Sequence, residues 1–63
     1  MPVLYAFYPC MPDGVAVSIE VMDLTSDAEA VERARRVLAD HNSAAYVVVW
    51  QASRQVAMAH RDC

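Results

Sequence analysis

The stretch from Ser26 to His41 constrains the fold most, because its apolar residues recur with the spacing of a helix. At about 100° per residue, one arc of this stretch is apolar and the opposite arc is charged. The apolar arc holds Ala30, Val31, Ala34, Val37, Leu38 and His41. We therefore predict an amphipathic helix that buries one face against the rest of the chain.

Signals at both ends support this helix. Ser26 and Glu29 form a capping box, in which each side chain accepts a hydrogen bond from the other residue's backbone N–H. Glu29 and Glu32 each precede an arginine by four positions, an order that favours ion pairing along the helix. We expect the helix to end near Asn42, with His41 as a structural cap for its last carbonyl groups.

Four segments outside the helix are rich in valine, tyrosine and other strand-forming residues. They are residues 3–8, 15–24, 45–52 and 55–60. Prolines and Asp13-Gly14 separate the first two segments, and a tight turn is expected at Ser53-Arg54. Residues 45–52 carry the strongest strand signal and belong in the interior of a sheet.

The order of these elements predicts a single α+β domain spanning residues 1–63. The expected arrangement is ββαββ, a four-stranded, mainly antiparallel sheet with one helix packed on one face. In residues 15–24 apolar residues alternate with others, and we expect the apolar set to face the helix. That set is Val15, Val17, Ile19 and Val21.

Composition narrows the class of protein. A hydrophobic content of 57% is typical of an ordered globular chain, and the net charge of −3 argues against a direct nucleic-acid binder. No apolar run approaches the roughly 20 residues of a membrane span, and the first residues lack a signal-peptide pattern. Two cysteines are too few for a disulfide framework. We expect a protein of the reducing cytoplasm that does not bind membranes.

The sequence lacks a pattern for catalysis. No nucleophile can be paired with a base from spacing alone, Cys10 reads as a loop thiol, and a single glycine excludes most nucleotide-cradling loops. His60-x-x-Cys63 has a spacing that a zinc site could use, but a second close pair of ligands is missing. We therefore expect no enzyme activity, no cofactor and no metal, with a zinc-binding protein as the least favoured alternative.

One helix can cover only one face of a four-stranded sheet, although residues 3–8 and 45–52 are apolar on both alternating faces. The uncovered side should hold Tyr46, Val48 and Trp50, or their alternates, with one set from residues 3–8. An exposed apolar patch of this kind marks an interface with a second copy or with another protein. The candidate partner-binding residues are Tyr5, Tyr46, Val48, Trp50, Glu20, Asp23 and Glu32.

The run WQASRQVA at residues 50–57, preceded by the strand AYVVV, resembles the C-terminal hairpin of short uncharacterised bacterial proteins. Along their chains those proteins have a strand, a turn, a second strand, a helix and then a Trp-x-x-x-Arg-x-Val-Ala hairpin. The matching residues here are Trp50, Arg54, Val56 and Ala57, with Asp13-Gly14 in the first turn. The glycine expected in the second turn is absent. The resemblance implies a ββαββ fold and no particular function.

In size, mild acidity, a helix on an antiparallel sheet and the lack of an active-site motif, the chain is also similar to small phage and mobile-element proteins, including anti-CRISPR proteins. This likeness implies a viral inhibitor that occupies the surface of a bacterial defence complex such as CRISPR-Cas. The alternative is a bacterial housekeeping protein that forms a homodimer through its sheet.

Overall fold

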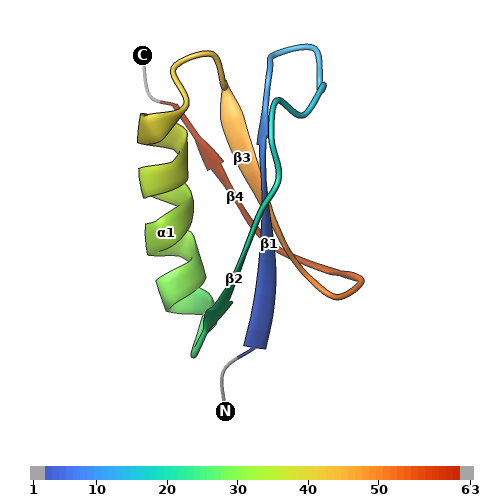
Figure 1. Ribbon diagram of the computed structural model, residues 1–63, viewed down its shortest axis with the longest axis vertical. Helices are drawn as coiled ribbons and strands as arrows, with labels where there is room; N and C mark the ends of the chain where they lie inside the picture. The colour runs from blue at the N-terminus through green and yellow to red at the C-terminus, as the bar shows by residue number, and fades with distance from the viewer. Residues whose placement is uncertain (1–2, 62–63) are drawn as a thin grey trace.

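The chain folds as one helix packed on one face of a four-stranded antiparallel sheet, in a computed structural model that describes residues 3–61 (Figure 1). The elements are β1 (Val3–Cys10), β2 (Glu20–Leu24), α1 (Asp27–Asp40), β3 (Tyr46–Gln51) and β4 (Arg54–His60). The strand order is β2-β1-β3-β4, so that β1 and β3 are central and β2 and β4 are edges. The predicted α+β class and ββαββ order are confirmed.

Helix α1 begins and ends where its capping groups lie. The Ser26 hydroxyl accepts from the Glu29 backbone N–H at 3.2 Å, and the Glu29 carboxylate accepts from the Thr25 N–H at 2.7 Å. At the other end His41, one residue before the predicted end, is the cap and its ring Nδ1 lies 2.9 Å from the Val37 oxygen. Glu32 lies 3.5 Å from Arg35 rather than pairing four residues along. Local signals therefore set both helix ends.

The core lies between α1 and the sheet. The predicted apolar arc is confirmed, with Ala30 and Ala34 fully buried and Val37 and Leu38 almost so. The two alanines let the helix backbone approach the sheet closely. They lie over aromatic and valine side chains of the two central strands. The sheet residues of the core are Tyr5, Phe7, Val47 and Val49.

Strand β2 is shorter than predicted, and the prediction of which side chains face the helix is wrong. Residues 15–19 form a loop, and Val15, Val17, Ile19 and Val21 are all exposed. The ladder pairs Tyr5 with Met22, which places Met22 and Leu24 beneath α1 and Val21 on the other side. Because successive side chains of a strand point to opposite faces, this register places every side chain of β2 on the face opposite to the predicted one.

Strand β1 is longer than predicted and includes Pro9 and Cys10. The Pro9 carbonyl accepts a hydrogen bond from the Val17 N–H, so the Pro9 nitrogen also faces the β2 side of the strand. The β1–β2 ladder has already ended at Phe7, so no ladder hydrogen bond needs a donor at Pro9. A missing donor is tolerated there. Cys10 was expected in a loop, but it is the buried last residue of β1, since the ladder with β3 extends to it.

The β3–β4 turn falls at Ala52 and Ser53, one residue earlier than predicted. Ala52 has a φ of 56°, in the left-handed region that glycine adopts without steric cost. This turn is the one in which a glycine was expected from the hairpin resemblance. The turn therefore holds an alanine in a conformation that favours glycine.

Candidate functional site: the open face of the sheet

The face of the sheet opposite α1, here called the open face, is built by the alternate residues of all four strands. Ala6 lies between Val21 of β2 and Trp50 of β3, and in the next row Tyr8 and Met58 flank Val48. Paired residues on neighbouring strands point to the same side of the sheet, so these rows form one continuous surface. The open face consists of Leu4, Ala6, Tyr8, Cys10, Val21, Asp23, Tyr46, Val48, Trp50, Gln55, Met58 and His60, of which Cys10 is buried.

This face is apolar over nearly its whole extent. Leu4 is 58% exposed, Val21 53% and Met58 42%, and the aromatic residues between them are partly buried by their neighbours in the sheet. Among residues 3–61, no second layer of the chain covers it as α1 covers the other face. Its aromatic and β-branched side chains form the kind of surface that buries apolar area in protein contacts.

The Tyr46 end of the open face is bordered by the loop of residues 11–19. The rings of Tyr46 and His60 lie 5.9 Å apart between centroids. Gly14, with a φ of 92°, lies against Tyr46, since a Cβ there would sit 3.7 Å from the Tyr46 hydroxyl oxygen. Figure 1 shows this loop and the β3–β4 turn on the side of the sheet away from α1. Exposed Val15, Val17 and Ile19 of the loop add apolar surface next to the sheet.

The structure separates the predicted partner-binding residues. Tyr46, Val48 and Trp50 share the open face, and Asp23 lies at its β2 edge opposite Leu4. Tyr5, by contrast, is only 2% exposed beneath α1, because the odd-numbered residues of β1 face the helix. Tyr5 therefore forms no part of this surface.

The three acids predicted to contact a partner do not form one surface. Glu20 pairs with Phe7 on the helix side, and its carboxylate lies 3.5 Å from the His41 ring. Glu32 is on the solvent side of α1 beside Arg35. Only Asp23 borders the open face. Sequence reasoning missed Leu4, Val21 and Met58, whose positions follow only once the strand register is known.

A polar cluster joins the start of α1 to β1 and β4. The Tyr5 hydroxyl donates to Asp27 at 2.7 Å, and the Arg54 guanidinium lies 3.4 Å from the same carboxylate. These hydrogen bonds, Tyr5 first and Arg54 second, lower the pKa of Asp27, and the bond to Asp27 raises the pKa of Tyr5. The cluster is structural, because it fastens the helix N-terminus to the sheet.

The described part of the chain contains no group of three or more His, Cys, Asp or Glu residues that could hold a metal ion. Cys63, half of the predicted zinc spacing, lies outside the described residues. His41 contacts Val37 and Glu20, which confirms its position as a helix cap. Within residues 3–61, no helix is long and apolar enough to cross a membrane.

Comparisons with protein-family models, curated proteins and solved structures found no match to this chain.

Proposed function

We propose that this protein is a non-enzymatic protein-binding module that acts by occupying a partner's surface with its open face. The observation that carries the proposal is the contiguous apolar surface around Trp50 and Val48, which the described chain does not cover. Contiguous exposed apolar patches on small proteins mark contact sites, and tyrosine and tryptophan concentrate contact energy.

The chemistry of the face favours a protein partner over other ligands. Within the described chain, its ionisable groups include Asp23 and His60 but no arginine, so it offers little to a phosphate backbone. Its side chains are aromatic, aliphatic and neutral in the centre. A partner with a flat apolar patch and a polar rim would complement it.

The likeness to anti-CRISPR proteins supports a sharper form of the proposal, in which the partner is a bacterial defence complex blocked by steric occupation. The alternative is a homodimer that buries two open faces against each other. A two-layer domain of 63 residues supports this alternative, since small domains gain stability from a second subunit.

Two measurements test these forms. Size-exclusion chromatography with light scattering determines whether the purified chain is a dimer, and whether Trp50→Ala converts it to a monomer. Plaque assays on a strain with active CRISPR-Cas immunity then compare the wild type with Trp50→Ala. We expect the wild type to restore plaques, and the variant to lose this effect.

Arg33→Ala, on the exposed side of α1, is the matched control and should behave as the wild type in both assays. A dimer dependent on Trp50 without any effect on plaques would favour the homodimer. A strict monomer whose behaviour in both assays ignores Trp50 would overturn the use of the open face.

A further inference from the structure

The two edge strands of the sheet differ in how they are protected against pairing with another chain. β2 has five residues and includes Glu20 and Asp23. β4 has seven residues, and its run QVAMA between Arg54 and His60 is uncharged. Short length and charge are the usual means by which proteins block an edge. A register shift in the β3–β4 ladder at Val49/Trp50 interrupts the start of β4, so the less protected edge is the regular stretch of β4 from Ala57 to His60.

The backbone of β4 presents hydrogen-bonding groups outward. Arg61 N–H donates to the Ala45 oxygen at 3.1 Å, which places residue 61 among those that bond toward β3. In an antiparallel ladder these groups alternate from one residue to the next. The N–H and C=O groups of Met58 and His60 therefore point away from β3, toward the free edge.

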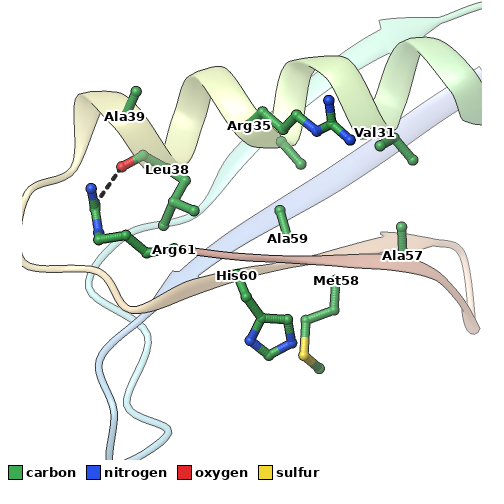
Figure 2. Close-up of a pocket in the computed structure, with 10 residues that line it drawn as sticks. Val31, Arg35, Leu38, Ala39, Ala57, Met58, Ala59, His60 and Arg61 are labelled. Atoms are coloured by element: carbon green, nitrogen blue, oxygen red, sulfur yellow. Dashed lines mark hydrogen bonds between the residues drawn. The ribbon is translucent and has the colours of Figure 1, made fainter. Parts of the chain in front are cut away.

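A groove of about 610 Å³ runs between this edge and α1. Figure 2 shows its lining, with Ala57 and Ala59 on the helix side of β4 and Met58 and His60 on the opposite side of the strand. The two alanines are short, which leaves room beneath the helix side chains Val31, Leu38 and Arg35. An extended segment lying along β4 would insert its alternate side chains into this groove.

Among residues 3–61, the lining of the groove includes Arg35 and Arg61 and no carboxylate, so this lining is positively charged although the protein is acidic. Arg61 is engaged, because its guanidinium donates to the oxygens of Leu38, His41 and Ala44 at 2.8 to 3.1 Å. The Arg35 side chain is 72% exposed and lies 3.5 Å from an equally exposed Glu32. Such a surface pair is weak, so Arg35 can exchange partners.

We propose that β4 accepts an extended acidic segment of a partner protein as a fifth strand, with a carboxylate on the helix side bonded to Arg35. A second copy fits this edge less well. In an antiparallel pair of β4 strands centred on Ala57, Arg54 of one copy would lie opposite His60 of the other. The Arg35 side chains of both copies would then lie beside the contact between the two strands. Charge complementarity therefore selects an acidic segment.

The test is a titration of the ¹⁵N-labelled protein with a capped peptide, Thr-Val-Thr-Glu-Thr-Val-Thr, monitored by NMR. Its length matches β4, and its valines and glutamate share one side. We expect the amide shifts of Met58 and His60 to change, and the same peptide with lysine in place of glutamate to bind about fivefold more weakly.

Two variants separate charge from strand pairing. Arg35→Glu lies on the exposed side of α1 and should reverse the preference, so that the lysine peptide binds better. Met58→Pro removes an N–H that points outward, a position where an edge strand tolerates proline, and should abolish binding of both peptides while the spectrum stays that of a folded protein.

Trp50→Ala should leave peptide binding unchanged, because Trp50 lies on the open face in β3 and not at the outer edge of β4. Peptide binding therefore tests this proposal separately from the proposed function. No shift change at about 1 mM peptide, or equal binding of the two peptides, would overturn the proposal. A peptide-free dimer that Met58→Pro dissolves and Trp50→Ala leaves intact would also overturn it, in favour of a second copy at this edge.

Discussion

The two faces of the sheet are made from the same strands and from similar side chains, yet one is core and the other is surface. Phe7, Val47 and Val49 are fully buried beneath α1, whereas their neighbours Tyr8 and Val48 face outward and are partly exposed. The difference comes from the single helix, which covers one face only (Figure 1). Apolar composition therefore does not distinguish a core from a contact surface. The arrangement of the layers does.

The comparison predicts that truncation is costly on the covered face and mild on the open one. Phe7→Ala should lower the free energy of unfolding by about 3–5 kcal/mol, because it leaves a cavity in the core. That is a large part of the roughly 3–9 kcal/mol expected for a chain of this length. Urea unfolding followed by circular dichroism measures it. Tyr8→Ala, the neighbour on the open face, should cost less than half as much, and equal losses would contradict the distinction.

A second matched pair lies on β2. Met22 packs against the core and Val21 is 53% exposed, so Met22→Thr should cost about 1–2 kcal/mol, whereas Val21→Thr should stay within about 0.5 kcal/mol. Thermal unfolding of the two variants gives the comparison. The reverse ranking would mean that β2 has the register first expected from the alternation, with Val21 beneath the helix.

Acid should weaken the attachment of the helix to the covered face. Hydrogen bonds from Tyr5 and Arg54 lower the pKa of Asp27 below 3.8, and those from Thr25 lower the pKa of Glu29 below 4.5. A carboxyl with a depressed pKa in the folded state adds stability above its unfolded pKa, and this is lost as the pH falls through the folded value. Stability should be constant above about pH 5 and decline below it.

Urea unfolding at a series of pH values measures this dependence. Tyr5→Phe removes the first donor to Asp27, and Asp27→Asn removes the titrating group, so both should flatten the decline. An unchanged slope in both variants would show that the cluster does not contribute.

The smallest effect is expected at the exposed β3–β4 turn, outside the core. Ala52→Gly relieves the left-handed conformation at φ 56° but adds freedom to the unfolded chain, with a net gain of about 0.5 kcal/mol. A shift in the melting temperature of a few degrees would show it. Ser53→Gly serves as the control, and a gain as large as that of Ala52→Gly would argue against relief of strain at Ala52.

Much of the fold could be read from local patterns. The helix ends follow from the Ser26 cap and the apolar arc, and the four strand segments were placed to within a few residues, apart from the start of β2. The open face was anticipated only in part. The prediction includes Tyr46, Val48 and Trp50, but it places Tyr5 there and omits Leu4, because β1 is apolar on both alternating sides and offers no local sign of which side the helix takes.

The sequence by itself determined the type and order of the elements, because capping, helical periodicity and turn residues act over a few neighbouring positions. Only the tertiary structure decided the strand order and the register. These depend on pairing between segments far apart in the chain, and a shift of one residue reverses which side of a strand is buried. The membership of the open face, the Tyr5–Asp27–Arg54 cluster and the free edge at β4 all follow from that pairing.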